Sequence, residues 1–546
     1  MGRRLPLLGV LWLGSSLFFL GDLGKYADDY FFAGRDPATG APVAAAALWA
    51  RPFYRPLAWV LVPGLERLFW FDDAWLHVVS AAAHGLAVAL LAALLLALGR
   101  SRVATLAAAG LFLVAPAHYE VVFWPAALPT GLASSLFLTV CLLTVRRARR
   151  RGGDGGRDRA FLCAIAVAAA AIPCLNEQAA AGLLALPLLH LAAAPRTTSR
   201  ERRRPLAATL AAWTGPALYG VLFWATSRPG MRGTQAVSPP IAALPGEAAR
   251  LAGEGLAHLC LRDFGSGALI AGLESLRAYP LRSAALLVAF SASAWLALRP
   301  RSSASGRSPG ERSPDRPAAA LAFGLAVFLL DWIPLLVVAG MAVSSRLTYA
   351  PSLGLAIAAA AAIDLVDRPL RWTAAYLSAR RLGALALTGV LALGLVAMIG
   401  IQARFRARSH ADRELAAELR RAVPDPAPDA LFLVLGDARR STTTGAARFD
   451  GALPSPLSLR QAATPFVRWV YRRRDLYAAQ VMPWIPVAIA ETTPDGPRLI
   501  GLEPAFPLPM AASPRGGVVV PWGNLVPLRI GMDGEVELVS RSEVRP

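Results

Sequence analysis

Apolar runs separated by short polar segments recur along the chain as far as Gln402. They cover residues 5–20, 74–98, 103–116, 128–145, 160–175, 179–194, 206–226, 283–298, 318–334, 349–366 and 382–401. A helix of about 20 apolar residues spans the hydrocarbon core of a bilayer. The pattern therefore predicts an all-α polytopic membrane bundle with about eleven transmembrane helices.

Composition agrees with this class. The chain has 546 residues, of which 55% are hydrophobic, and its mean hydropathy is +0.46. Its net charge of +20 is carried by arginine, with Lys25 as the single lysine. We attribute the arginine to codon usage and expect no nucleic-acid partner. The four cysteines have no paired spacing, which argues against a disulfide framework or a cysteine metal site.

The position of the arginines predicts the topology. They cluster in short loops, for example 146–151, 196–204 and 299–316. Because short loops rich in Lys and Arg stay in the cytoplasm, we expect a multi-pass protein of the inner (plasma) membrane with a cytoplasmic N-terminus. The first apolar run lacks a small-residue cleavage site, so we expect it to be retained. The loops that then face the opposite side are 21–73, 117–120, 176–178 and the one around Arg346.

The composition changes after Gln402. A polar segment of helical pattern, 403–422, precedes a Pro-rich region with strand-like runs at 430–435, 518–520 and 535–539. We therefore expect two domains. One is a transmembrane domain, 1–402, with 21–73 as its first periplasmic loop, and the other is a small soluble β or irregular domain, 403–546, outside the cytoplasm.

Three acidic residues are candidates for catalysis. Asp28 and Asp29 follow the first apolar run between aromatic residues, and Glu120 lies between two later runs. Carboxylates beside a span are costly unless water, a cation or a substrate meets them. Asp28 and Asp29 fit solvated loop residues equally well, and Glu120 also fits the cap of a re-entrant turn.

Basic residues are candidates for binding an anion. Arg51 and Arg55 are four residues apart and could clamp an anionic group, although a solvated face explains them equally well. Arg346 precedes an apolar run and either binds a ligand or lies among lipid headgroups. His77 and His84 share one helical face, for which we favour a buried polar role over a ligand role. The sequence has no metal-ligand spacing.

Five segments together resemble the integral-membrane GT-C glycosyltransferases, and most nearly the transmembrane protein O-mannosyltransferase family. The segments are Asp28-Asp29, Tyr54–Leu57 followed by His77 and His84, Pro116–Val121, Asn176-Glu177 and Arg346–Gly354. Within them, PAHYEV is similar to the family's HP-x-H-x-E-[AV] loop, and RLTYAPSLG is similar to its R-x-x-Y-x-PS-x-G signature. Order and spacing match over residues 20–366, whereas no tetratricopeptide period follows.

The resemblance implies a polyprenyl-phosphate-sugar-dependent hexosyltransferase. A sugar would pass from the lipid-linked donor to a protein or glycan acceptor on the extracytoplasmic side, with membrane lipid around the donor's tail. A carboxylate would act as general base, Asp28 first, with Asp29 and Glu120 as alternatives. The residues implied to bind the donor phosphate are Arg346, Tyr349, His118, Arg51 and Arg55. No cofactor is certain, and a divalent metal is left open.

Two other functions compete with this interpretation. A transporter or flippase of lipid-linked substrates predicts charged residues at mid-span and repeated spans. Asp331 is the nearest such residue, and no repeat is evident. A catalytically inactive membrane scaffold is the second. It is kept open by two departures from the family pattern: Pro129-Thr130 stands near the place of a family Asp, and Asn176 stands in place of a family Lys.

Overall fold

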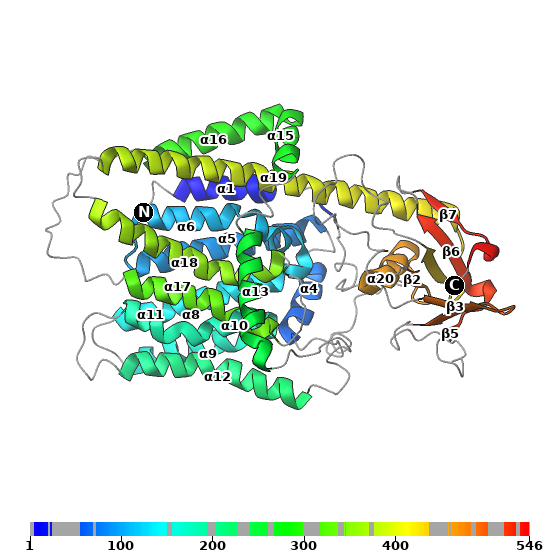
Figure 1. Cartoon of the computed structure of the whole chain (residues 1–546), viewed down its shortest axis with the longest axis horizontal. Helices are drawn as coiled ribbons and strands as arrows, with labels where there is room; N and C mark the ends of the chain where they lie inside the picture. The colour runs from blue at the N-terminus through cyan, green and yellow to red at the C-terminus, as the bar shows by residue number, and fades with distance from the viewer. Residues whose placement is uncertain are drawn as a thin grey trace. The chain divides into compact units, whose positions relative to one another are not determined.

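The computed structural model of the chain describes residues 5–19, 22–24, 55–68, 73–149, 155–193, 203–226, 241–259, 267–298, 317–336, 343, 345–370, 376–435, 457, 460–481, 488–500, 518–530 and 535–544 (Figure 1). Contacts divide the chain into two units. Unit 1 is built mainly from His77–Gln402 and includes Arg55, and unit 2 is built mainly from Ala403–Pro546.

Unit 1 is helical, and its longer helices make the chain a multi-pass protein by length and composition. Seven segments among the described residues are long and apolar enough to cross a membrane: Ala74–Ala97, Pro125–Arg149, Asp158–Leu175, Pro280–Ala297, Pro317–Leu335, Arg346–Asp367 and Leu382–Ala422. An eighth results if the bent pair Arg102–Val114 and Pro116–Phe123 counts as one span.

The expected number of about eleven spans is not confirmed, and three segments account for the difference. Helix α1 (Leu5–Leu17) has 13 residues, fewer than a straight span needs. The run at 179–194 is divided into α10 (Gln178–Ala181), η4 (Gly182–Ala185) and α11 (Leu186–Ala193). Helix α12 (Arg203–Thr226), which contains Pro216, is not among the seven described spans either.

The other helices before α19 follow the expected apolar runs only in part, because those at 56–68, 241–257 and 268–278 lie between the runs. They are α4 (Pro56–Leu68), α5 (Asp73–Ala97), α6 (Arg102–Val114), η2 (Pro116–His118), α7 (Tyr119–Phe123), η3 (Pro125–Ala127), α8 (Leu128–Arg149), α9 (Gly155–Leu175), η5 (Ile241–Ala243), α13 (Leu244–Ala257), α15 (Ala268–Ala278), α16 (Pro280–Leu298), α17 (Pro317–Leu330), η8 (Ile333–Leu335) and α18 (Ser345–Leu370). Helix α19 (Tyr376–Ala422) begins in unit 1 and continues into unit 2 without a break.

Helix α18 packs against both α6 and α17 (Figure 1). Ser101, at the start of α6, is bonded to Asp364 late in α18, so α6 and α18 run antiparallel. On the other side, a Cβ atom on Gly354 of α18 would lie 2.4 Å from the backbone nitrogen of Phe328 in α17. Small residues allow such close approach of helices in membranes. Gly354 therefore fixes where α18 crosses α17.

Unit 2 contains two sheets. In the first, with strand order β2-β1-β6-β7, β1 (Leu431–Leu435) is parallel to β2 (Tyr477–Val481) and to β6 (Leu525–Ile530), and β7 (Val536–Leu538) is antiparallel to β6. Helix α20 (Arg460–Tyr471) precedes β2. The second sheet is antiparallel, with β4 (Pro497–Ile500) between β3 (Ala488–Thr492) and β5 (Val518–Val519). Short 3-10 turns lie at Trp522–Asn524 and Arg541–Glu543.

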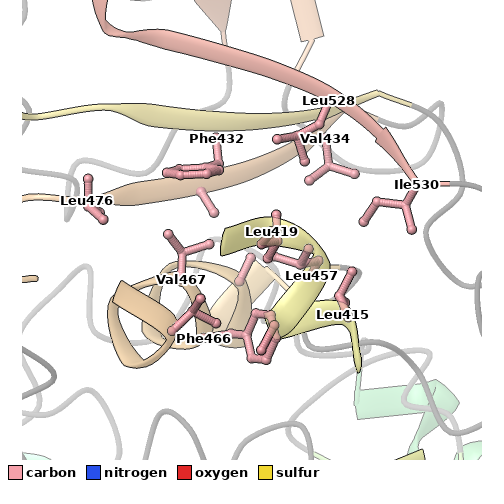
Figure 2. Close-up of a cluster of buried hydrophobic side chains, with 14 of the residues drawn as sticks. Leu415, Leu419, Phe432, Val434, Leu457, Phe466, Val467, Leu476, Leu528 and Ile530 are labelled. Carbon is pink, nitrogen blue, oxygen red and sulfur yellow. The ribbon is translucent and has the colours of Figure 1, made fainter. Parts of the chain in front are cut away.

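Strand β1 is the centre of this unit because both of its faces are buried. Phe432 and Val434 pack on the helical layer that contains Phe466 of α20 and Leu419 of α19 (Figure 2). The alternate residues of β1 join a second core on the opposite face. Burial on both faces is typical of a strand in a parallel sheet and explains the uninterrupted apolar run at 430–435. The expected strand-like runs form β1, β5 and β7, and α20 adds a helical layer that the sequence analysis did not anticipate.

Candidate functional site

The start of α18 brings Glu120 and Arg346 together. The backbone N–H of Arg346 donates to Glu120 Oε2 at 2.8 Å. The first N–H groups of a helix have no partner within the helix and carry partial positive charge, so a carboxylate is stabilising there. Glu120 thus caps α18 from α7, the short helix that follows α6 and η2. The cap of a re-entrant turn, offered for Glu120 from the sequence, is a different one.

The side chain of Arg346 lies at this helix start. It is exposed, and its guanidinium carbon lies 5.0 Å from the centroid of the Trp124 ring. A guanidinium over an indole face is held by cation–π attraction. The arrangement presents a cationic group, with a carboxylate beside it, at one end of the helix bundle.

Behind this group lies a buried network that fixes α18. Tyr349 and His84 are joined by a 2.8 Å bond between the Tyr hydroxyl and His84 Nδ1, and His84 Nε2 lies 3.0 Å from the Leu113 carbonyl. A carbonyl can only accept, so Nε2 carries the proton of His84 and Nδ1 accepts from Tyr349. His84 therefore ties α18 to both α5 and α6.

His118 forms the second tie. Its Nδ1 lies 2.8 Å from the Phe112 carbonyl and its Nε2 lies 2.8 Å from Ser352 Oγ. His118 and Tyr349 both have no exposed surface. In this structure these polar atoms have protein partners, and the contacts of His118 and Tyr349 help to fix α18; their expected contact with a donor phosphate stays a prediction. His77 is likewise buried.

Arg55 is engaged by a carboxylate. Its Nε and Nη2 donate to the two carboxylate oxygens of Glu177, at 2.7 and 2.5 Å. The side chains are 36% and 38% exposed. Burial alone would lower the pKa of Arg55 and raise that of Glu177, but the opposite charge and the two hydrogen bonds outweigh it. The pKa of Arg55 is therefore raised and that of Glu177 lowered.

One hydrogen bond connects this pair to the start of α18. Gln178, the residue after Glu177, donates from Nε2 to the Leu347 carbonyl at 2.6 Å. Leu347 in turn follows Arg346 in the chain. The loops that carry Glu120, Glu177 and Arg346 therefore meet at one end of unit 1. The arginine distribution had predicted that these loops lie on one side of the membrane, and Gln178, which joins two of them, was not among the candidate residues.

Three of the candidate residues, Asp28, Asp29 and Arg51, lie outside the described residues. Their roles therefore stay predictions. Within the described part of the chain, no group of three or more His, Cys, Asp or Glu side chains has the geometry to hold a metal ion. Asp331, the acidic residue noted at mid-span, is 2% exposed at the end of α17.

Comparison with known proteins finds solved structures of low similarity. No family profile matches the chain, and no curated protein sequence matches it. ArnT from Cupriavidus metallidurans bound to undecaprenyl phosphate is 13% identical, with 88% of this chain and 85% of that chain covered and a TM-score of 0.41. An Archaeoglobus fulgidus oligosaccharyltransferase tethered to an acceptor peptide is 13% identical, with 87% and 63% covered and a TM-score of 0.38. The archaeal oligosaccharyltransferase AglB from the same organism, in complex with an inhibitory peptide and a dolichol-phosphate, is 14% identical, with 84% and 65% covered and a TM-score of 0.37.

Proposed function

We propose that the chain is a GT-C-like membrane glycosyltransferase. It moves a sugar from a polyprenyl-phosphate donor to a protein or glycan acceptor on the extracytoplasmic side. The observation that carries the proposal is the start of α18, where an exposed arginine and a carboxylate meet at the end of a multi-pass helical bundle. The motif residues around Arg346 serve to hold it there.

The chemistry fits these side chains. A carboxylate takes the proton of the acceptor hydroxyl as its oxygen attacks the anomeric carbon. The bond between that carbon and the phosphate oxygen breaks, and the leaving lipid phosphate gains negative charge. Arg346 stabilises that charge, because its planar guanidinium can donate to two phosphate oxygens at once. The positive N-terminus of α18 adds to the stabilisation.

In this proposal the roles of the candidates differ. Asp28 is the general base, with Asp29 and Glu120 as alternatives. His118 and Tyr349 act by positioning Arg346. Arg55 binds phosphate after it exchanges Glu177 for the donor, and Arg51 assists it. The N-terminus is cytoplasmic, and unit 2 lies outside the cytoplasm and helps to select the acceptor.

The carboxylates provide the test. We expect that membranes containing the protein transfer label from a radiolabelled polyprenyl-phosphate sugar to an acceptor. Asp28→Asn should lower turnover by about 10²–10⁴, the range for loss of a general base. Normal turnover in Asp28→Asn, with Asp29→Asn or Glu120→Gln inactive, would move the base to another residue of the same site. If all three variants are active, the glycosyltransferase proposal is wrong. The same assay with a chelator tests the divalent metal.

Transport of a lipid-linked substrate is the second candidate function, and Asp331 is the observation that favours it. A buried acidic residue inside an apolar segment commonly marks a substrate or ion path. In reconstituted vesicles a transporter would move the labelled lipid across the bilayer and leave its sugar–phosphate bond intact, whereas the proposed enzyme would break that bond.

A further inference from the structure

Proline 351 leaves a gap in the hydrogen bonding of α18. In an α-helix each carbonyl accepts from the N–H four residues later. The partner of the Leu347 carbonyl would be residue 351, which is proline and has no N–H. A carbonyl one residue after Arg346 is thus left without its helical donor, inside a membrane segment where an unsatisfied polar group is costly.

Gln178 supplies the missing donor. Its Nε2 reaches the Leu347 carbonyl at 2.6 Å from the first residue of α10, which is 169 positions away in the chain. The side chain is 2% exposed, so the bond lies in a water-poor environment, where a hydrogen bond is electrostatically strong. The amide of α10 thus replaces the backbone N–H that Pro351 of α18 lacks.

The position of Gln178 is itself fixed by its neighbours. Asn176 Oδ1 accepts from the backbone N–H of Gln178 at 2.9 Å, and Asn176 Nδ2 donates to Thr130 Oγ1 at 2.8 Å. The bonds run in an unbroken series from Thr130 on α8, through Asn176 and Gln178, to Leu347 on α18. The start of α18 is therefore braced against α8.

The side-chain amide of Gln178 is satisfied only in part. Among the described residues, Gln178 Oε1 is buried and has no hydrogen-bond partner. Leaving one amide oxygen unsatisfied costs free energy that an apolar side chain of the same size would avoid. A residue that carries this cost while it satisfies the carbonyl next to Arg346 is suited to positioning.

We infer that Gln178 is a positioning residue that holds the first turn of α18, and with it Arg346, in place for the phosphate of a lipid-linked donor. The inference rests on the proposed function for the identity of the ligand. The role of Gln178 in holding the first turn of α18 is inferred from the hydrogen bonds of this chain alone. Gln178 touches no reacting atom and acts through the Leu347 carbonyl.

A double-variant experiment tests this. Gln178→Met keeps the side-chain size and removes the donor, so we expect the KM for a polyprenyl-phosphate sugar to rise roughly 5- to 30-fold, the loss for one or two hydrogen-bond equivalents. We expect kcat to change much less. Pro351→Ala restores an N–H for Leu347, so Gln178→Met should have little further effect in that background. Amide exchange over residues 346–350 should rise in Gln178→Met and return in the double variant.

Gln402→Met is the matched control. This glutamine of α19 is also fully buried. It bonds two backbone groups, the Phe19 N–H and the Ser15 carbonyl, and neither of them belongs to α18. It should lower stability and leave the donor KM unchanged. An unchanged KM and unchanged exchange in Gln178→Met would overturn the inference. So would equal impairment with and without Pro351→Ala. A wild-type protein that uses no polyprenyl-phosphate sugar would refute the proposed function, while the exchange measurement would still decide the role of Gln178.

Discussion

Each end of the α6–α18 pair has an arginine, a carboxylate and the start of a helix, but the arginine is exposed at one end and buried at the other. At the Arg346 end, Glu120 accepts from the first turn of α18 and the arginine is exposed over Trp124. At the Arg100 end, Asp364 accepts from the Ser101 N–H, at the start of α6, at 3.0 Å. There the arginine Nη1 lies 3.5 Å from Asp364 Oδ2, and the two side chains are only 1% and 10% exposed.

The two arginines differ in exposure and in what their guanidinium groups contact. Arg100 turns back on its own chain, and its Nε and Nη2 both donate to the Leu98 carbonyl, at 3.3 and 3.0 Å. Arg346 is exposed, and its guanidinium lies over the face of the Trp124 ring. At the Arg100 end the pairing of arginine, carboxylate and helix start is buried and stabilises the fold. At the Arg346 end it leaves a cationic side chain exposed, for which we propose a ligand-binding role.

The largest effect on stability should follow from breaking the buried pair of Arg100 and Asp364. Asp364→Ala leaves Arg100 as a buried charge without its carboxylate, so we expect the free energy of unfolding to fall by about 3–5 kcal/mol, as for other broken buried pairs. Denaturant or thermal unfolding in detergent measures it. The double variant Arg100→Met/Asp364→Leu should recover much of the loss, since apolar replacement of a buried pair is often neutral. A loss below about 1 kcal/mol for Asp364→Ala would show that the pair is not a structural lock.

Substitution of the exposed Arg346 should change donor binding and leave the free energy of unfolding unchanged. Arg346→Lys keeps the charge and the backbone bond to Glu120 but cannot donate to two phosphate oxygens in one plane. We expect donor use to weaken by about 1.5–3 kcal/mol, roughly 10- to 150-fold, with unchanged unfolding. Arg102→Lys, at the exposed start of α6, is the matched control and should have no effect. Unchanged donor dependence in Arg346→Lys would remove Arg346 from the site.

The half-exposed pair of Arg55 and Glu177 should give the smallest effect and a pH signature. The folded-state pKa of Glu177 is lowered, so its stabilisation is complete above its ordinary pKa of about 4.5 and is lost as the pH falls through the lowered value. Glu177→Gln should cost about 0.2–1 kcal/mol at neutral pH. The difference between wild type and variant should vanish in acid. Unfolding midpoints measured between pH 3 and 7 test this, and a difference that grows in acid would contradict it.

Most of the candidate site residues could be chosen from the sequence. His84, His118, Glu120, Arg346 and Tyr349 were all singled out from their sequence patterns, and the structure brings them to one end of unit 1. Their roles divide by burial, which a pattern does not report. His118 and Tyr349 have no exposed surface and hold α18, whereas Arg346 is exposed.

The structure also explains two other residues of the segment Arg346–Gly354. Gly354 allows the close crossing with α17, and Ser352 reaches His118. Asp28, Asp29 and Arg51 remain sequence-based proposals, and so does the domain boundary at residue 403.

The sequence by itself determined the membrane class, because runs of apolar residues near 20 in length need no tertiary information to be recognised. Its expected number of about eleven spans was not confirmed among the described residues, because short and interrupted apolar segments such as α1 and 178–193 pack within a bundle as readily as they cross a bilayer. Pro351 in the sequence already dictates a free carbonyl at Leu347. Which of the distant side chains satisfies it was decided only by the fold, because hydrogen bonding over 2.6 Å depends on how α10 and α18 pack and not on their separation along the chain.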